Sequence, residues 1–220
     1  MSKELKKRIL TSVVLLSLLY LMYLYSYVLI ILVIIISLIS WVEFYSLISK
    51  IFFKDNFKEK LLLFLGKALS MAYFFFLIGL ILFVESQKPH LKFFIIYPLM
   101  VSIATDIGGM TFGKLFKGKK LTKISPKKTI SGSIGSFIIS VLLIPFFYDY
   151  FFNYGLLTII IITVMISLVS QIGDLFISYI KRKAKVKNTS NILPGHGGFL
   201  DRIDGIIFSI PSGYFLFNLF

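Results

Sequence analysis

Long apolar runs separated by short, lysine-rich polar stretches dominate the pattern of this chain. A helix that crosses a membrane needs roughly 20 mostly apolar residues, and several runs reach that length. The pattern therefore predicts an all-α fold, a polytopic transmembrane helix bundle with about seven spans. We expect these spans at residues 9–25, 27–49, 61–85, 91–116, 133–152, 155–180 and 203–220. The first two form an N-terminal helical hairpin over residues 9–49, and the last span is short.

Composition agrees with a membrane protein. Of the 220 residues, 57% are hydrophobic and only 15% are charged, and the mean hydropathy is +0.90. A soluble domain would have about a quarter of its residues charged. We therefore expect residues 1–220 to form a single integral membrane domain. The chain has no cysteine, which excludes disulfides and thiolate metal sites.

The basic residues are distributed unevenly along the chain. Lys and Arg number 24 against 10 Asp and Glu, for a formal net charge of +14. In a soluble protein this balance would suggest nucleic acid, but here the lysines gather in alternate polar segments, around residues 3–8, 50–60, 114–128 and 181–187. The positive-inside rule places such segments in the cytoplasm. We expect no nucleic-acid partner, and an integral protein of the cell (plasma or inner) membrane whose polar chemistry faces the cytoplasm.

Two acids interrupt apolar spans. Asp106 and Asp174 each lie about two helical turns before a basic loop. A charge within a span costs roughly 3 kcal/mol on insertion scales and is tolerated when it faces the bundle interior and has a partner. One interpretation is a carboxylate paired with a lysine that reaches in from the loop. The other is a cation site open to the cytoplasm, which would also suit an ion-conducting transporter.

A denser polar cluster begins at Gly173 and reads GDLFISYIKRKAKVKNTSNILPGHGGFLDRIDG. Asp174 and Ser178 are four residues apart and share one helical face. Lys181 and Arg182 follow them, and such side chains bind phosphate oxygens. The glycine-rich turn at residues 194–198 would let backbone N–H groups approach an anion closely.

The cluster ends in two further acids at the start of the last span. Asp201 and Asp204 are three residues apart and can point the same way from a first helical turn. Mg²⁺ prefers carboxylate and phosphate oxygens and neutralises charge during phosphoryl transfer. The ordinary alternatives are a helix cap for Asp201 and a backbone hydrogen bond for His196. Acids, bases and glycines together indicate a metal-dependent site for a phosphorylated substrate, with a catalytic part over residues 104–210.

A third cluster precedes the fifth span. Lys127 and Lys128 stand among hydroxyl residues and glycines between Ser125 and Gly135. A helix N-terminus preceded by such residues is a ready anion site, although an ordinary basic loop has the same composition. Near the end of the second span, we expect Glu43 to pair with a loop lysine.

The stretch from Gly173 to Gly205 resembles the signature of the phosphatidate cytidylyltransferase (CDP-diacylglycerol synthase) family. The matching positions are Ser178, Lys181, Arg182, Lys187, residues 194–198, Asp201, Arg202 and Asp204. Residues 105–113 and 125–129, and the hairpin that ends in Trp41 and Glu43, also resemble that family. Asn188 stands where the family usually has Asp, so we assign no metal to position 188. The chain also looks shorter than typical bacterial members.

The resemblance implies the reaction of CTP with phosphatidate to give CDP-diacylglycerol and pyrophosphate, with membrane lipid around the site. It implies Mg²⁺, alone or with a second cation, and it allows a homodimer. The implied catalytic residues are Asp174, Asp201, Lys181 and Arg182. The implied metal ligands are Asp174, Asp201 and Asp204. The implied substrate-binding residues are Lys127, Lys128, Ser178, Gly195, His196, Gly197, Gly198, Arg202 and Asp106.

Three alternatives stay open at this point. A related CTP-dependent transferase could act on another lipid phosphate, as an archaeal CDP-archaeol synthase does. An ion-conducting transporter would explain Asp106 and Asp174 but has no need of a phosphate cradle. A catalytically inactive lipid-binding relative is distinguished only by assay. The enzyme interpretation requires Asp174 and Asp201 to converge on a cavity that the cytosol can reach.

Overall fold

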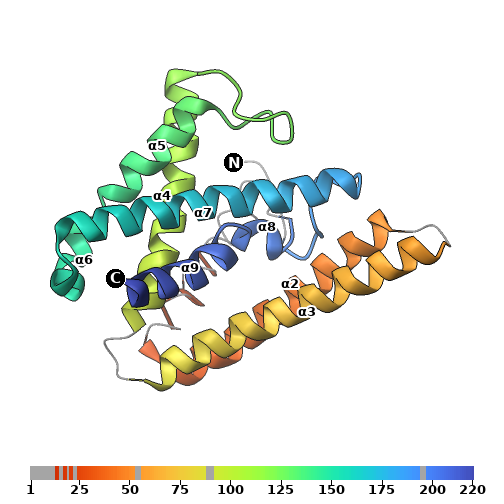
Figure 1. Ribbon diagram of the computed structural model, residues 1–220, viewed down its shortest axis with the longest axis horizontal. Coiled ribbons are helices and arrows are strands. Elements are labelled where there is room, and N and C mark those ends of the chain that lie inside the picture. The colour runs from red at the N-terminus through yellow and green to blue at the C-terminus, as the bar shows by residue number, and fades with distance from the viewer. Residues whose placement is uncertain are drawn as a thin grey trace. The chain divides into compact units, whose positions relative to one another are not determined.

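The computed structural model describes residues 13–14, 17–18, 20–21, 24–52, 56–87, 92–193 and 197–220. Over these ranges the regular structure is helical, apart from two isolated bridges between single residues. The elements shown in Figure 1 are α2 (Ser26–Ile51), α3 (Phe57–Ser86), α4 (Phe93–Phe116), α5 (Ile130–Val141), α6 (Ile144–Phe151), the 3-10 helix η2 (Phe152–Tyr154), α7 (Leu156–Lys183), α8 (Leu200–Ile203) and α9 (Ile206–Leu219). The predicted all-α fold is confirmed.

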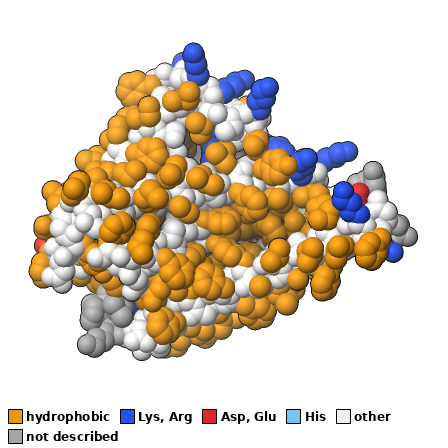
Figure 2. Space-filling view, viewed as in Figure 1, with side chains coloured by type: hydrophobic (Ala, Val, Ile, Leu, Met, Phe, Trp, Pro, Cys, Tyr) orange, Lys and Arg blue, Asp and Glu red, His pale blue; other side chains and the backbone are white. Residues whose placement is uncertain are grey.

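Four helices, α2, α3, α4 and α7, are long and apolar enough to cross a membrane. The pair Ile130–Val141 and Ile144–Tyr154, bent by 47°, makes a fifth when it is taken as one broken span. Large apolar side chains lie exposed along these helices, with Phe64 at 68% and Leu157 at 72%, and Figure 2 shows how widely apolar side chains cover the visible surface. Exposed apolar surface on helices long enough to span a bilayer identifies an integral membrane protein. The span expected at residues 9–25 lies largely outside the described ranges, so a total of seven spans stays a prediction.

The end of the chain differs from the single span expected at residues 203–220. The short helix α8 ends at Ile203, a turn follows at Asp204 and Gly205, and α9 then begins at Ile206. The 14 residues of α9 extend about 21 Å, less than the roughly 30 Å of a hydrocarbon core. The turn packs tightly, since a Cβ at Gly205 would lie 2.5 Å from Ser170 Oγ.

The chain divides into two compact units. The first, here the loop unit, comprises Met1–Phe83 with Ile180–Ile203, and the second, here the core unit, comprises Val84–Tyr179 with Asp204–Phe220. Helices α3 and α7 each contribute to both units. The expected single domain over residues 1–220 stays a prediction.

In the core unit, α4 packs against α5 through small residues. A Cβ at Gly108 would lie 2.4 Å from the carbonyl oxygen of Gly135, so the two backbones approach as closely as small residues allow. Hydroxyls also connect α4 to α5 and α7: Thr105 Oγ1 lies 2.9 Å from Ser140 Oγ and 2.7 Å from Ser167 Oγ. Hydrogen bonds between hydroxyls satisfy polar atoms that lipid cannot.

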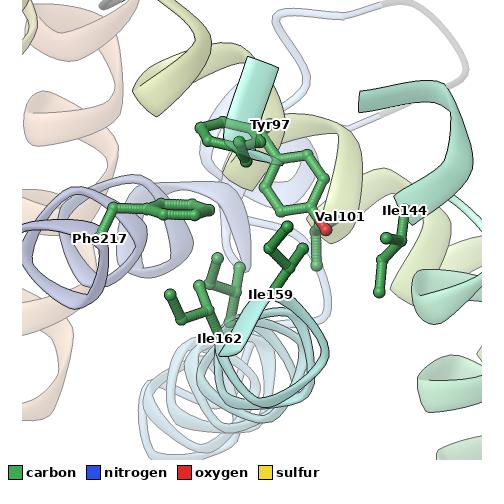
Figure 3. Close-up of a cluster of buried hydrophobic side chains, with 8 residues drawn as sticks. Tyr97, Val101, Ile144, Ile159, Ile162 and Phe217 are labelled. Atoms are coloured by element: carbon green, nitrogen blue, oxygen red, sulfur yellow. The ribbon is translucent and has the colours of Figure 1, made fainter. Parts of the chain in front are cut away.

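A second part of the core unit is aromatic and aliphatic. Tyr97 and Phe217 pack with Ile159 and Ile162, all four nearly or fully buried, as Figure 3 shows. The hydroxyl of Tyr97 lies 2.5 Å from Thr163 Oγ1, so its polar end is satisfied inside the core. This packing fixes α4, α7 and α9 with respect to one another.

In the loop unit, α2 and α3 form a hairpin. A Cβ at Gly66 of α3 would lie 3.1 Å from the side chain of Ile48 on α2. Lys67 Nζ lies 3.7 Å from the centre of the Tyr45 ring, a cation–π contact between the same two helices. Helix α2 therefore has a fixed partner on one side, and it contacts α8 as well.

Candidate functional site

Three polar residues follow one face of α7 near its C-terminal end. Asp174, Ser178 and Lys181 are spaced by four and three residues, which places them on one side of a helix. Ser178 Oγ donates to Asp174 Oδ1 over 3.3 Å, so the two side chains lie on one helical face, as predicted. Asp174 belongs to the core unit and Lys181 to the loop unit.

In the loop unit, Lys181 forms a buried ion pair with Asp201. Lys181 Nζ lies 2.7 Å from Asp201 Oδ1, and both side chains are only 9% exposed. Asp201 Oδ2 accepts hydrogen bonds from the backbone N–H of Thr189, at 2.8 Å, and of Gly198, at 3.0 Å. The hydroxyl of Thr189 also lies 3.1 Å from Oδ2. Each carboxylate oxygen has about two acceptor positions, so the two backbone N–H groups fill those of Oδ2, while Oδ1 is paired with Lys181.

These contacts set the protonation of Asp201. Burial by itself would raise the pKa of this carboxyl, but the hydrogen bonds from Lys181, Gly198 and Thr189, together with the charge of Lys181, outweigh burial and lower the pKa below its ordinary value of 3.8. Asp201 is therefore a carboxylate at neutral pH.

The end of α7 directs the chain from Lys181 into the loop. Lys185 adopts a left-handed conformation with φ of 56°, the usual way for a helix to end. The N–H of Val186 donates to the Lys181 carbonyl over 3.0 Å, and the N–H of Lys185 donates to that of Arg182 over 3.1 Å. These two bonds make a Schellman motif. The exposed Arg182 side chain also donates to the Val186 carbonyl over 3.3 Å.

The glycine-rich turn is closed at its base. Leu193 and Gly197 exchange two backbone hydrogen bonds, of 2.8 and 3.1 Å, on either side of residues 194–196. Gly197 has φ of 88°, a conformation that favours glycine. A Cβ at Gly198 would lie 2.0 Å from Thr189 Oγ1, so this position has no room for a side chain. The positions of Gly195 and His196 lie outside the described residues, and their roles stay predictions.

Glu43 of α2 is a site residue that the sequence analysis missed. Its side chain is 3% exposed. Its partners are two hydroxyls and two backbone N–H groups, not the loop lysine that we expected. Oε1 accepts from Ser190 Oγ (2.6 Å) and Phe199 N (3.1 Å), and Oε2 accepts from Thr189 Oγ1 (2.8 Å) and Leu200 N (2.9 Å). The expectation was wrong because the loop supplies enough donors to satisfy a buried carboxylate without a lysine.

In the core unit, Asp174 forms an ion pair with Lys128, each side chain roughly a quarter exposed. Lys128 ends a turn in which its N–H donates to the Ser125 carbonyl over 3.0 Å, and Pro126 takes the position that proline favours. Lys127 is exposed. The lysine that enters the site from the predicted 125–135 cluster is therefore Lys128.

Beside this pair, α5 and α7 share a polar contact. Ser133 Oγ donates to Gln171 Oε1 over 2.6 Å, whereas the buried Gln171 Nε2 has no partner in the described residues. Gln171 precedes Asp174 by three residues and so shares its helical face.

Other predicted site residues are placed differently. Asp106, expected to face the bundle interior, is exposed, because α4 turns the adjacent Thr105 and the nearby Gly108 into its contacts with α5. Asp204 is buried, and its Oδ1 accepts from Gly205 N over 3.0 Å. The side chain of Arg202 is exposed.

The acids differ in their fitness for a cation. No three His, Asp or Glu side chains gather into a metal-binding group among the residues that the structure describes. Asp174 has two polar contacts and partial exposure, which leaves acceptor positions for a hard cation such as Mg²⁺. Asp201 would first have to release Lys181 or a loop donor. The two acids lie in different units, so their convergence stays a prediction.

Comparison with known proteins shows the family of this chain. The model of the cytidylyltransferase family matches residues 3–220. The chain belongs to the cytidylyltransferase family. Curated proteins named phosphatidate cytidylyltransferase are similar to this family member: that of Rickettsia typhi is 40% identical over 152 residues, covering 65% of each chain. That of Staphylococcus haemolyticus is 41% identical over 139 residues, covering 61% of this chain and 52% of the relative. The chain thus spans less than two thirds of the length of these relatives.

Proposed function

We propose that this cytidylyltransferase transfers the cytidylyl group of CTP to phosphatidate, giving CDP-diacylglycerol and pyrophosphate. The observation that carries the proposal is the family match, which runs from residue 3 to residue 220. The name that the similar Rickettsia and Staphylococcus proteins bear supports the choice of lipid. Four or five apolar spans support a substrate that lies in a membrane.

The reaction itself needs little acid–base chemistry. A phosphate oxygen of phosphatidate, already anionic at neutral pH, attacks the α-phosphorus of CTP. The bond from that phosphorus to the oxygen bridging to the β-phosphate breaks, and pyrophosphate leaves with the bonding electrons. No proton has to be removed from the nucleophile, so positioning and charge stabilisation supply most of the catalysis.

The basic residues of the chain would perform that stabilisation. Lys181 is held rigidly by Asp201 at 2.7 Å, so its charge is preorganised and reorients little during the reaction. Arg182 and Arg202 are exposed, and each guanidinium can bind two phosphate oxygens at once. Lys127, also exposed, would bind a more distant phosphate.

Asp174 is the carboxylate best suited to hold a divalent cation, since its contacts with Ser178 and Lys128 leave acceptor positions unused. Mg²⁺ bound there would supply charge neutralisation for the triphosphate. Lys128 would then turn from Asp174 toward a substrate phosphate, which the length and flexibility of its side chain permit. Asp201 would contribute by holding Lys181 and the glycine-rich turn.

The basic loops support an orientation with the site facing the cytoplasm, most simply in the cell membrane, because lysines concentrate near the ends of spans on one side. CTP is then available from the same compartment. A homodimer stays a prediction from the family resemblance.

The test is an assay of purified protein in phosphatidate-containing nanodiscs with Mg²⁺ and CTP labelled at the α-phosphate. We expect label in the lipid fraction and release of an equal amount of pyrophosphate. A panel of diacyl and ether-linked lipid phosphates separates phosphatidate from other acceptors. Labelling of none of these lipids would contradict the proposal, and labelling of ether lipids alone would assign a different substrate.

A further inference from the structure

Glu43 spends its entire hydrogen-bonding capacity on one loop. The four donors belong to residues 146 to 157 positions later in the chain. Each carboxylate oxygen accepts one hydroxyl and one backbone N–H, which fills about four acceptor positions. At 3% exposure, Glu43 is not placed to bind a substrate. Its contacts instead fix the conformation of the loop.

The contacts continue from Glu43 to the buried ion pair. Thr189 Oγ1 lies 2.8 Å from Glu43 Oε2 and 3.1 Å from Asp201 Oδ2. Its single proton can be donated to only one carboxylate at a time, but the Thr189 N–H bonds Asp201 as well, at 2.8 Å. Glu43 thus fixes Thr189, Thr189 binds Asp201, and Asp201 in turn orients Lys181.

Glu43 also acts on the backbone just before Asp201. It accepts from the N–H groups of Phe199 and Leu200, at 3.1 and 2.9 Å. A Cβ at Gly198 would lie 2.5 and 2.6 Å from the two Glu43 oxygens. The loop backbone therefore lies against this carboxylate. Because Asp201 follows directly in the chain, the same contact fixes where its side chain begins.

We infer that Glu43 is a positioning residue: it holds the loop at Thr189 and Ser190 and at Phe199 and Leu200 in the conformation in which Asp201 pairs with Lys181. The catalytic consequence rests on the proposed function, whereas the order of the loop does not. When this restraint is lost, binding of CTP has to order the loop, so part of the binding energy is lost.

Glu43→Gln removes the charge with little change of size. Glutamine accepts on one oxygen only, so its NH₂ group faces either Ser190 and Phe199 or Thr189 and Leu200. The hydroxyl of that pair can turn to accept, but the backbone N–H cannot, so its hydrogen bond is lost. Loss of one hydrogen bond to a charged group corresponds to roughly 10- to 100-fold in an equilibrium constant. We therefore expect the KM for CTP to rise roughly 10- to 100-fold, with a fall in kcat of less than about 5-fold, because saturating CTP restores the loop.

Thr189→Val tests the same connection with a smaller change and serves if Glu43→Gln does not fold. We expect a smaller rise in KM, and a double variant less impaired than the two single effects combined, because both changes break one network. Glu59→Gln, in the first turn of α3, is the matched control and should leave KM and kcat unchanged.

Hydrogen exchange of the intact protein in detergent is the measurement that does not depend on activity. Glu43→Gln should speed amide exchange at residues 189–193 and 197–200 by at least about 10-fold, and leave exchange in α4 unchanged. Unchanged loop exchange would overturn the inference, as would faster exchange with wild-type KM. If the wild-type protein has no cytidylyl transfer, the proposed function fails together with the catalytic consequence, and exchange alone then decides whether Glu43 orders the loop.

Discussion

The ion pair between Lys181 and Asp201 gives the sharpest prediction about this protein. Asp201→Asn can keep the two backbone hydrogen bonds from the loop if its oxygen takes the place of Oδ2. Its NH₂ group then faces Lys181 Nζ, which at present lies 2.7 Å from Oδ1. The change replaces an attractive ion pair by two hydrogen-bond donors that face each other. It also leaves the charge of Lys181 unpaired at 9% side-chain exposure.

The magnitude follows from the burial of both partners. Removing one member of a buried ion pair costs about 3–5 kcal/mol, and we take about 3 kcal/mol because the loop bonds survive. For a chain of this size that corresponds to a fall in Tm of about 6–12 °C. If Lys181 acts in the transition state, the same loss lowers kcat/KM by about 100-fold or more.

A double-mutant cycle separates the interaction energy of Lys181 with Asp201 from the effects of the single substitutions. Lys181→Met alone leaves Asp201 without its cation, while Lys181→Met with Asp201→Asn removes both charges of the pair. We expect the double variant to melt higher than either single variant, yet to stay at least about 100-fold less active than the wild type. Lys183→Met, at an exposed position of the same helix, is the control. Losses in Tm that simply add, or a double variant with wild-type activity, would refute this reasoning.

Three further predictions follow from the contacts of single residues. Asp174→Asn should lower kcat by at least about 100-fold with unchanged Tm. The control Asp149→Asn, at an exposed acid of α6, should keep full activity. Equal kcat values for the two variants would contradict the assignment of a cation to Asp174. Gly198→Ala should lower Tm by several degrees, since its Cβ would lie 2.0 Å from the Thr189 hydroxyl. Gly79→Ala, whose Cβ would meet nothing within 4 Å, should leave Tm unchanged. Equal Tm values for the two variants would contradict the close packing at Gly198. Because the pKa of Asp201 is lowered, its stabilising effect is complete above its ordinary value of 3.8 and is lost as pH falls through the lower folded value. Loop proteolysis should therefore increase only below about pH 4, and an onset near pH 6 would contradict this assignment.

The apolar pattern predicted the helices well, because a long apolar run inside a membrane has to satisfy its own backbone hydrogen bonds and the helix does so. Helices α2, α3, α4 and α7 lie close to their expected ranges. The start of the last span was predicted less well: we expected it at Ile203, whereas the chain turns at Asp204 and Gly205 and the helix begins at Ile206. That turn depends on tight packing against Ser170, and such a contact leaves no mark in local hydropathy.

The candidate site was predictable where its residues are close in sequence. Ser178 and Asp174 needed only helical spacing. The pairing of Lys181 with Asp201 and the contacts of Glu43 depend on tertiary structure. A usable signal did exist: a lone acid such as Glu43 in an apolar helix requires donors when buried. The sequence does not specify which donors those are.

The most direct test of cytidylyl transfer is the fate of each phosphorus of CTP. In parallel reactions with phosphatidate, CTP labelled at the α-phosphate should place its label in lipid, and CTP labelled at the γ-phosphate should place it in pyrophosphate, in equal amounts. Label from the γ-phosphate in the lipid, or label in neither product, would contradict the account.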